Sequence, residues 1–387
     1  MVWKLLAMPK NKLIYVIAGE ASGDAHAARM LTELNLVAPN YKIKGIGGDK
    51  MRATGVETFV DFSELAVMGL VEVLKRYRSL KKIFNRTVAL LKVEQPDLLI
   101  LVDYPGFNLK LAKEAKALGI KVLYYISPKV WAWRAGRVKT INKYVDHMAV
   151  LFPFEVPIYK DAGVPVTCVG HPLVDAVKKE LTTEQAKAKL AIKADQQVLG
   201  LFPGSRRSEV DVLLPIMIEV AQRLSQKIEN LAVVVPLATG LDKAVLEPII
   251  ANSSLNIKVV DDDFYHLTSA CDAIVAASGT VTLEIALLAV PHFISYRVSP
   301  ISYAILSRFV KIPYVGLCNI VTGDNIVLEL LQNEVTAERF EQELFSLLTD
   351  KHSKEKAERI RQQVLSALGP AGGAKNMAEL VVSLLEK

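Results

Sequence analysis

Short apolar runs alternate with longer amphipathic segments along most of the chain, and each short run has the length of a buried strand. The first strand is predicted at residues 13–18, with a helix to about residue 36 and a second strand at residues 41–46. Further strands are predicted at residues 97–102, 122–126, 198–202, 231–236, 257–260 and 272–276. This alternation predicts an α/β protein with parallel sheets and helices on both faces.

The segment at residues 277–296 combines a strand end, a tight turn and an apolar helix. The turn is Ser278-Gly279-Thr280, and the helix runs to about Ala289. Because backbone N–H groups at the start of a helix lack intrahelical partners, the turn favours an anion. Glu284 lies within the apolar helix, and a ribose diol is one good partner for its carboxylate; a solvent-facing position is the alternative.

The chain length of 387 residues and a hydrophobic content of 51% predict two domains, each with its own core. A Gly-His-Pro turn at residues 170–172 marks the junction between an N-terminal domain at 1–172 and a C-terminal domain at 173–350. Residues 351–387 are predicted to be helical, with a bend at the glycine-rich stretch 369–373. The first domain is a candidate surface for this last segment.

Composition and charge limit the kinds of function that fit this sequence. The formal net charge of +6 suits anionic substrates or a membrane surface better than it suits a dedicated nucleic-acid binder. Cys168, Cys271 and Cys318 are far apart and form no Cys-x-x-Cys pair, which predicts reduced thiols rather than disulfides or a zinc site. No apolar run is long enough for a signal peptide or a spanning helix, so we expect a soluble protein that can touch a membrane.

Two stretches in the first half place polar groups at the carboxyl ends of strands, where open parallel sheets bind ligands. Glu20, Ser22 and Asp24 lie in the loop at residues 19–24, and helix capping is the alternative role for one of them. Asp103 follows the strand at 97–102.

With Asn108 taken as the N-cap of the next helix, the Asp103 carboxylate is left to accept a proton from a hydroxyl nucleophile. A turn-stabilising aspartate beside Pro105 is the alternative. His171, in the junction turn, is a candidate to neutralise a phosphate, although a hydrogen-bonded turn histidine is more common.

An anion site is predicted in the second half, after the strand at 198–202. Gly204 permits close backbone approach, Ser205 follows it, and Arg206 offers a bidentate fork for phosphate oxygens. A long helix follows, with a capping box expected at Ser208 and Asp211. The site is not a Walker loop, because Gly-Lys-Ser/Thr is absent. The Asp261–Asp263 run lacks a second carboxylate cluster, so we predict a solvated turn there and no metal site.

Residues 63–86 have the pattern of a basic amphipathic helix. Apolar residues recur at helical spacing, and basic residues cluster behind them, which is typical of a helix that lies on an anionic membrane. The predicted membrane contacts are Met68, Leu70, Lys75, Arg76, Arg78 and Lys82. The alternative is an ordinary core helix with a solvated basic face.

A further loop, at residues 127–134, carries two tryptophans. Trp131 and Trp133, flanked by Lys129, Arg134 and Arg137, would suit a pocket for an amphiphile. Paired tryptophans belong more often to a core.

Taken together, these motifs resemble one family. They include Gly-Glu-Ala-Ser-Gly-Asp at 19–24, Ala-Val-Met-Gly at 66–69, Asp-Tyr-Pro-Gly-Phe-Asn at 103–108, Ser-Pro at 127–128 with Trp-Ala-Trp-Arg at 131–134, Pro-Gly-Ser-Arg at 203–206, Ala-Ser-Gly-Thr at 277–280 and the stretch 314–319. In this order, over about residues 12–340, they resemble the lipid-A-disaccharide synthases. The sequence departs from the family pattern at Cys318, where the family has a proline, and in the extension at residues 1–11.

The resemblance implies a glycosyltransferase B-type fold, with two Rossmann-like domains that face each other across a cleft. It implies an inverting hexosyltransferase of lipid A and lipopolysaccharide synthesis in Gram-negative bacteria, without a metal or a cofactor. The substrates would be UDP-2,3-diacylglucosamine and 2,3-diacylglucosamine 1-phosphate, and UDP would be released. The expected location is the cytoplasmic face of the inner membrane, as a peripheral protein on anionic lipid, with a homodimer left open.

The resemblance also assigns roles to the candidate residues. Asp103 is the candidate base, with His171 as its competitor. By the resemblance, Arg206, Glu284 and Asn319 would contact UDP. Together with the two turns predicted to bind an anion, the residues expected to bind the UDP-sugar are Gly204, Ser205, Arg206, Ser278, Gly279, Thr280, Glu284 and Asn319. Glu20, Ser22 and His171 would line the acceptor side of the cleft.

Two other functions stay open at this point. One is another UDP-sugar enzyme of the same architecture, such as a peptidoglycan-type N-acetylglucosaminyltransferase or an epimerase. The other is a non-catalytic lipid-binding or membrane scaffold protein built around the basic helix. Release of UDP with acylated and unacylated acceptors separates all three.

Overall fold

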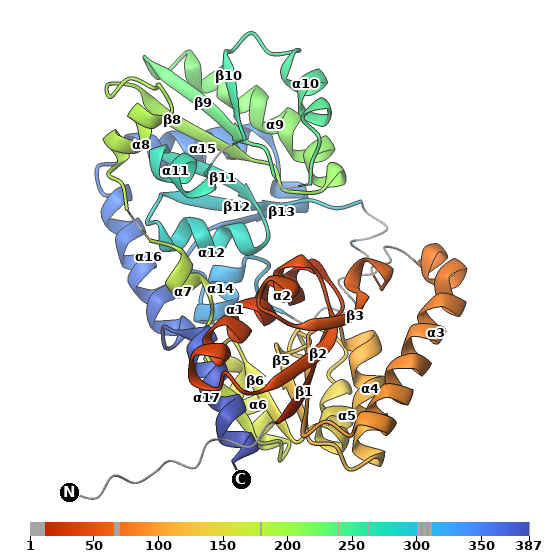
Figure 1. Ribbon diagram of the computed structural model, residues 1–387. Coiled ribbons are helices and arrows are strands. Elements are labelled where there is room, and N and C mark those ends of the chain that lie inside the picture. The colour runs from red at the N-terminus through yellow and green to blue at the C-terminus, as the bar shows by residue number, and fades with distance from the viewer. Residues whose placement is uncertain are drawn as a thin grey trace, which may run out of the picture. The chain divides into compact units, whose positions relative to one another are not determined.

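The structure is a computed structural model, and it describes residues 12–65, 70–178, 180–238, 240–261, 263–299, 303, 308 and 312–386, without the side chains of residues 70–76. The chain divides into two compact units. Unit 1 holds the residues up to Pro172 and those from Gly369 onward, and unit 2 is Leu173–Leu368. Each unit has its own parallel sheet, of seven and six strands, which confirms the predicted fold class (Figure 1).

Unit 1 is a parallel sheet with the strand order β3-β2-β1-β4-β5-β6-β7. Its strands are β1 Leu13–Ala18, β2 Lys42–Gly47, β3 Glu57–Asp61, β4 Leu98–Val102, β5 Val122–Tyr125, β6 His147–Val150 and β7 Val166–Cys168. Its main helices are α1 Ala21–Val37, α2 Asp49–Ala53, α3 Leu70–Glu94, α4 Pro105–Ala117, α5 Arg137–Tyr144, α6 Val156–Asp161 and α17 Gly373–Leu385, with short 3-10 turns at Phe62–Glu64 and Pro153–Glu155. The strand order places β1 and β4 side by side, so their carboxyl ends meet at the centre of the sheet.

The fully buried strands of unit 1 explain why their sequence is almost continuously apolar. Alternate residues of β1, such as Tyr15 and Ile17, pack in one core with α3, α4 and α5, while Ile14 and Val16 face the other side of the sheet. Figure 1 shows α3, α4 and α5 on one face of this sheet, and α17 lies against α1 on the other.

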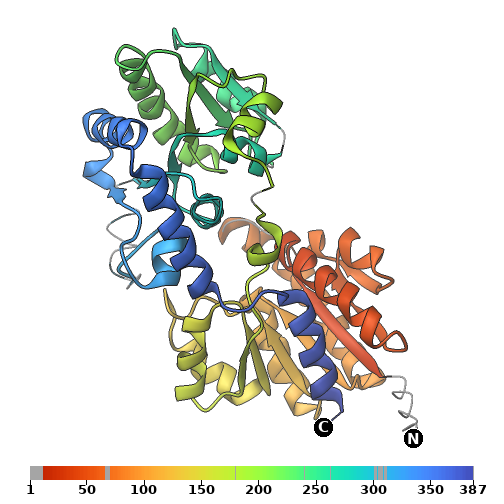
Figure 2. The same cartoon turned by 90° about the vertical axis from the view of Figure 1, so that its left-hand side faces the viewer.

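The C-terminal segment is split between the two units. Helix α16 (Ser353–Leu368) stays in unit 2, where Arg361 Nε donates to the Leu287 carbonyl at 2.9 Å. Unit 2 therefore extends to Leu368 and past the residue 350 expected from the sequence. Helix α17 lies along unit 1 (Figure 2), where Asn376 Nδ2 donates to the Val169 carbonyl at 2.9 Å.

Unit 2 repeats the architecture with the strand order β10-β9-β8-β11-β12-β13. Its strands are β8 Gln197–Phe202, β9 Leu231–Pro236, β10 Ile257–Val260, β11 Ala273–Ala277, β12 His292–Tyr296 and β13 Glu329–Leu331. Its helices, besides α16, are α7 Leu173–Ala176, α8 Thr183–Lys189, α9 Arg207–Ser225, α10 Lys243–Ile250, α11 Phe264–Ala270, α12 Thr280–Leu287, α14 Leu317–Thr322 and α15 Ala337–Thr349, with a 3-10 turn at Gln332–Glu334. One core packs α9, α10 and α15 on the sheet, and a second packs α8, α11 and α12 on its other face.

Four predicted helix starts were wrong. Helix α1 begins at Ala21, so Ser22 and Asp24 lie in its first turn rather than in a loop. Helix α4 begins at Pro105 with Tyr104 as the N-cap, because proline suits the first helical position; Asn108 is therefore inside the helix. Helix α9 begins at Arg207, so the predicted box at Ser208 and Asp211 does not form. Residues Phe62–Glu64 form a 3-10 turn, so α3, which is described from Leu70, does not start near residue 63.

Candidate functional site

Asp103 lies directly after β4, at the carboxyl edge of the unit 1 sheet. Its backbone N–H donates to the Tyr125 carbonyl at 2.9 Å. Its own carbonyl accepts from the Tyr124 hydroxyl at 2.6 Å and from Asn108 Nδ2 at 2.8 Å. Three hydrogen bonds from neighbouring elements therefore hold the main chain that carries this carboxylate.

The backbone around Asp103 is strained. Asp103 and Tyr104 both have φ near +44°, in the left-handed region that side chains other than glycine seldom adopt. Such strain persists only where the surroundings enforce it, and it is concentrated at functional sites. Asn108 supplies part of the enforcement, because its buried amide also donates to the Val102 carbonyl at 3.2 Å. The residue predicted as a helix cap instead shapes the loop that presents Asp103.

The environment of Asp103 makes it a stronger base than an ordinary aspartate. Burial raises the pKa of Asp103 to about 6, and the negative charge of Glu20 adds to the rise. The positive charges of Lys129 and Arg137 and the backbone N–H of Tyr104 lower the pKa without cancelling the rise. The carboxylate is ionised at neutral pH, and its proton affinity is closer to the working pH than that of a solvated aspartate.

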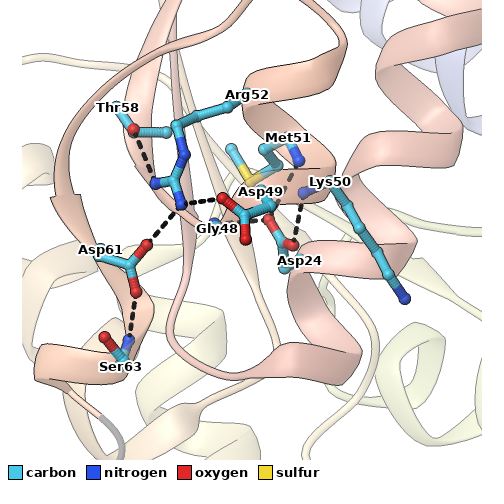
Figure 3. Close-up of polar contacts among 9 residues, drawn as sticks. All are labelled: Asp24, Gly48, Asp49, Lys50, Met51, Arg52, Thr58, Asp61 and Ser63. Carbon is cyan, nitrogen blue, oxygen red and sulfur yellow. Dashed lines mark hydrogen bonds and ion pairs between the residues drawn. The ribbon is translucent and has the colours of Figure 1, made fainter.

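The loop after β1 contributes one pair of polar groups and one structural cap. Ser22 Oγ donates to Glu20 Oε1 at 2.8 Å, so the two predicted acceptor-side residues are hydrogen-bonded to each other. Asp24 is buried and accepts from the backbone N–H groups of Gly48 at 2.7 Å and Met51 at 3.2 Å (Figure 3). Asp24, which lies in the first turn of α1, therefore caps the start of α2. Capping was the alternative role predicted for one of these residues.

His171 is buried against an aromatic ring in unit 1. Its imidazole stacks on Phe152 at 4.9 Å between ring centroids and 23° between planes. Burial lowers the pKa of His171 to about 4, and the nearby His26 adds to the lowering. The imidazole is therefore neutral at physiological pH and supplies no positive charge to a phosphate, although a neutral ring keeps the ability to accept a proton.

The tryptophan loop is anchored by a buried carboxylate. Trp131 Nε1 donates to Glu155 Oε1 at 3.1 Å, and burial raises the pKa of Glu155 to about 7. Trp133, by contrast, is 42% exposed. The two tryptophans predicted as a pair thus have different environments: one is fixed to the core and the other faces solvent.

The predicted anion loop of unit 2 lies between β8 and α9, and Gly204 in it has φ of +109°. Arg206 is the N-cap of α9, and 76% of its side chain is exposed. The Glu209 carboxylate accepts from the backbone N–H groups of Ser205 at 3.2 Å and Arg206 at 3.3 Å, and from Arg206 Nη1 at 3.1 Å. The carboxylate of Glu209, as the capping-box residue of α9, therefore binds the donors that were predicted to hold a diphosphate.

The second predicted donor region is the turn between β11 and α12. Gly279 and Thr280 are exposed, and Ser278 Oγ donates to the Val315 carbonyl at 2.6 Å. Glu284 is half-buried on α12, where its Oε1 accepts from the Tyr265 hydroxyl at 3.2 Å. Burial raises the pKa of Glu284, and the hydrogen bond from Tyr265 opposes that rise.

Asn319 lies in the interior of unit 2, on α14, with no exposed surface. Its Nδ2 donates to the Val327 carbonyl at 2.7 Å and to Glu329 Oε1 at 2.8 Å, and its Oδ1 accepts from the Val327 N–H at 3.0 Å. Glu329 in turn accepts from the N–H groups of Val315 and Gly316, both at 2.9 Å. This geometry supports a role in shaping the 314–317 turn, because direct contact with a nucleotide would require these bonds to open.

The predicted membrane helix is partly described. Met68 lies outside the described residues, as do the side chains of Leu70, Lys75 and Arg76. Farther along α3, Arg78 and Lys82 are exposed and Tyr77 is 56% exposed. Ile83 and Leu91 pack on the core of unit 1. The described part of α3 is therefore a core-packed helix with a basic outer face.

Two further predictions concern the aspartate run at residues 261–263 and the three cysteines. Asp263 caps α11, accepting from the Tyr265 N–H at 2.9 Å and the His266 N–H at 3.3 Å. Within the described parts of the chain, no three His, Cys, Asp or Glu side chains are grouped to hold a metal. Cys168, Cys271 and Cys318 are free thiols.

Sequence reasoning missed two residues of these sites. Glu209 follows Arg206 by three positions, which is the spacing of a capping-box glutamate and was visible in the sequence. Tyr265 lies 19 residues before its partner Glu284, and no local pattern connects the two.

Comparison with known proteins adds to this geometry. The family model described as lipid-A-disaccharide synthetase matches residues 14–382. The lipid-A-disaccharide synthase of Trichlorobacter lovleyi is 46% identical over 382 residues, covering 99% of this chain and 100% of that protein. The enzyme of the same name from Coxiella burnetii (strain Dugway 5J108-111) is 40% identical over 382 residues, covering 97% and 99%.

Solved structures resemble the chain in fold alone. The UDP-GlcNAc 2-epimerase from Neisseria meningitidis bound to UDP-GlcNAc superposes with a TM-score of 0.62 at 14% identity, covering 97% of this chain and 100% of that one. A glycosyltransferase from Rickettsia africae superposes with a TM-score of 0.60 at 13% identity, covering 97% and 98%.

Proposed function

Because the chain belongs to the lipid-A-disaccharide synthase family, we propose that it transfers 2,3-diacylglucosamine from its UDP derivative to 2,3-diacylglucosamine 1-phosphate. Glycosyl transfer in lipid A synthesis is the shared activity of the relatives that match its full length. The observation that carries the proposal is this full-length match together with the activated carboxylate Asp103. The epimerase alternative rests on a likeness of fold at 14% identity, and it is not favoured.

In the proposed mechanism, Asp103 of unit 1 takes the proton from the acceptor hydroxyl as that oxygen attacks the anomeric carbon of the donor. Attack from the face opposite UDP inverts that carbon. In unit 2, Arg206 and the backbone N–H groups of its loop hold the diphosphate, whose negative charge grows as it leaves. Glu284 holds the ribose.

A UDP-release assay tests this proposal. We expect UDP release with the donor and 2,3-diacylglucosamine 1-phosphate, and little release with an unacylated acceptor. Release without any acceptor, or equal release with unacylated N-acetylglucosamine derivatives, would favour another UDP-sugar enzyme. A protein that binds acylated substrates but releases no UDP would be the non-catalytic lipid-binding protein.

Glu284 provides a test of the donor site. Glu284→Gln keeps the side chain's size but weakens its acceptor strength toward a ribose diol. We expect UDP affinity to fall about 10-fold, since hydrogen bonds to a charged group contribute about 1.5–3 kcal/mol. Titration calorimetry with UDP measures this effect. Tyr265→Phe, which removes the hydroxyl at 3.2 Å from Glu284 but leaves the carboxylate, is the matched control and should change UDP affinity less.

We further propose that α3 attaches the protein peripherally to the cytoplasmic face of the inner membrane. No helix among the described residues is long and apolar enough to span a bilayer. Both proposed substrates carry acyl chains that stay in the membrane, so the enzyme must work at its surface. The exposed basic face of α3 supports this attachment, because each basic residue near an anionic surface contributes about 1 kcal/mol.

Charge reversal tests the attachment. A variant with Lys75, Arg76, Arg78 and Lys82 changed to Glu should no longer sediment with vesicles that contain phosphatidylglycerol. The control reverses four other lysines of unit 1, namely Lys110, Lys113, Lys139 and Lys160, which are exposed on other helices. The control should still sediment. If the α3 variant sediments like the unmodified protein, the attachment proposal fails.

A further inference from the structure

The loop between β5 and α5 gathers cations around one exposed aromatic ring. The Arg134 guanidinium lies 4.5 Å from the centroid of the Trp133 ring, and the Arg137 guanidinium lies 5.1 Å from it. Lys129 is exposed in the same loop. These four residues, here named the Trp133 cluster, all belong to unit 1.

No acidic side chain forms an ion pair with the described residues of the Trp133 cluster, and the one carboxylate that acts on Arg137 is that of Asp103. Among the ion pairs of the described residues, none includes Lys129, Arg134 or Arg137, and the first turn of α5 holds no acidic residue. Arg137 is the first residue of α5, so its charge adds to the positive end of that helix, where cations are disfavoured and anions favoured. Burial lowers the pKa of Arg137, and the like charge of Arg134 lowers it further. These positive charges and the start of α5 together favour an anion beside the cluster.

The fold nevertheless holds these cations in place. Lys129 and Arg134 have φ of +37° and +54°, a left-handed conformation that is unfavourable for both. The intervening Trp131 is fixed by its hydrogen bond to buried Glu155, and Val130 is buried as well. A loop without contacts to the core would leave this unfavourable backbone conformation. The buried Val130 and the Trp131–Glu155 hydrogen bond therefore hold the cluster in place.

The Trp133 cluster is also close to the candidate base. The Asp103 N–H donates to the carbonyl of Tyr125, the last residue of the strand that leads into the Lys129 loop, at 2.9 Å. Lys129 and Arg137 also act on the Asp103 carboxylate and lower its pKa. When the hydroxyl of a sugar phosphate reaches Asp103, the phosphate on the same sugar is close enough to contact these cations. We propose that the Trp133 cluster binds the phosphate monoester of the acceptor, with Arg137 as its central ligand. This inference rests on the proposed function, which supplies an acceptor that carries both a nucleophilic hydroxyl and a phosphate.

Paired acceptors test the assignment. Arg137→Met keeps the length of the side chain and removes its charge. With 2,3-diacylglucosamine 1-phosphate, kcat/KM for the acceptor should fall about 10- to 100-fold, the range expected for losing a hydrogen bond to a charged group. With the dephosphorylated acceptor at pH 8, where Asp103 is ionised in both proteins, the loss should be much smaller, because only the effect of Arg137 on the pKa of Asp103 remains, and the donor KM should not change. Lys139→Met, an exposed lysine on the same helix, is the charge-matched control and should behave as the unmodified protein with both acceptors.

Three results would overturn the assignment. Equal losses of kcat/KM with the two acceptors would mean that Arg137 does not bind the phosphate. Equal losses together with lost sedimentation on phosphatidylglycerol vesicles would assign the cations to lipid headgroups instead. An unchanged kcat/KM would remove Arg137 from binding. Should Arg137→Met not fold, as judged by its melting curve, Lys129→Met takes its place with the same expected pattern.

A binding measurement separates this inference from the proposed function. Glucosamine 1-phosphate, which needs no membrane and no turnover, should change the intrinsic tryptophan fluorescence of the unmodified protein, and glucosamine should not. The change should disappear in Arg137→Met and in Trp133→Phe. If the unmodified protein releases no UDP yet shows this response, the proposed function fails and the phosphate site stands. If it turns over without the response, the phosphate site fails alone.

Discussion

The Asp103→Asn variant is expected to lose most of its turnover while it folds normally and still binds UDP. A hydroxyl is a poor nucleophile until its proton is removed, and a positioned carboxylate contributes about 10²- to 10⁴-fold to such a step. Asparagine keeps the size and polarity of Asp103 but accepts no proton. His171→Gln, which removes the competing base, should keep near-normal turnover. If instead the histidine variant is inactive with intact UDP affinity and Asp103→Asn is active, His171 is the base.

The same substitution is expected to raise stability, which a purely structural aspartate would not do. The pKa of Asp103 rises from 3.8 to about 6 on folding, so the unfolded chain ionises first and the free energy of unfolding falls as pH rises through that window. Above pH 6, folding bears the full free-energy cost of keeping Asp103 ionised in its buried position. A pKa shift of about 2 units corresponds to a cost of at most about 3 kcal/mol. Asparagine removes this cost and adopts the left-handed conformation more readily than most residues. A higher melting temperature at pH 8, with the difference shrinking toward pH 4, would confirm it.

The pH dependence of turnover distinguishes the two candidate bases. If Asp103 is the base, kcat/KM should fall on the acidic side with a midpoint near pH 6, because the protonated carboxyl cannot accept the proton. If His171 is the base, the midpoint should lie near pH 4. Glu155 has a raised pKa of about 7 and could add a third transition. Glu155→Gln removes that transition and should leave the one near pH 6.

The sequence predicted most of the strands, because a short apolar run bounded by turn residues is a local signal. It failed where one residue has several compatible roles. Asn108 has the chemistry of an N-cap, yet Pro105 at the first helical position gives that role to Tyr104, and the asparagine amide binds the carbonyls of Val102 and Asp103 instead. The signal for the correct start was in the sequence, since proline favours exactly that first turn of a helix.

Asn319 could not have been placed from local pattern. Its partners Val327 and Glu329 lie eight and ten residues away, and their approach depends on the return of the chain from α14 to β13. A buried asparagine with every polar group bound is a product of tertiary packing. The family resemblance identified the position as important, but burial and hydrogen bonding favour a supporting role for it rather than nucleotide contact.

Arg206→Ala is expected to reduce both turnover and donor affinity. Arg206 Nη1 donates to Glu209 at 3.1 Å, and a diphosphate must displace that carboxylate from the guanidinium and from the N–H groups of Ser205 and Arg206. The donor offers more negative charge than one carboxylate, and that charge grows as UDP leaves. Removing Arg206 should therefore cost about 2–4 kcal/mol of transition-state stabilisation, read from kcat/KM for the donor.

Arg207→Ala is the matched control for this prediction. The two arginines are adjacent and both have 76% of the side chain exposed, but Arg207 pairs along the helix with Asp211 at 3.6 Å. The two arginines do not differ in side-chain exposure. A loss of kcat/KM for the donor that occurs in Arg206→Ala and not in Arg207→Ala therefore assigns diphosphate binding to Arg206. Because the proposed mechanism assigns the charge of the leaving diphosphate to Arg206 and not to a metal ion, EDTA should leave turnover unchanged. Activity that EDTA abolishes and magnesium restores, or equal losses in both arginine variants, would contradict Arg206 as the group that neutralises the leaving diphosphate.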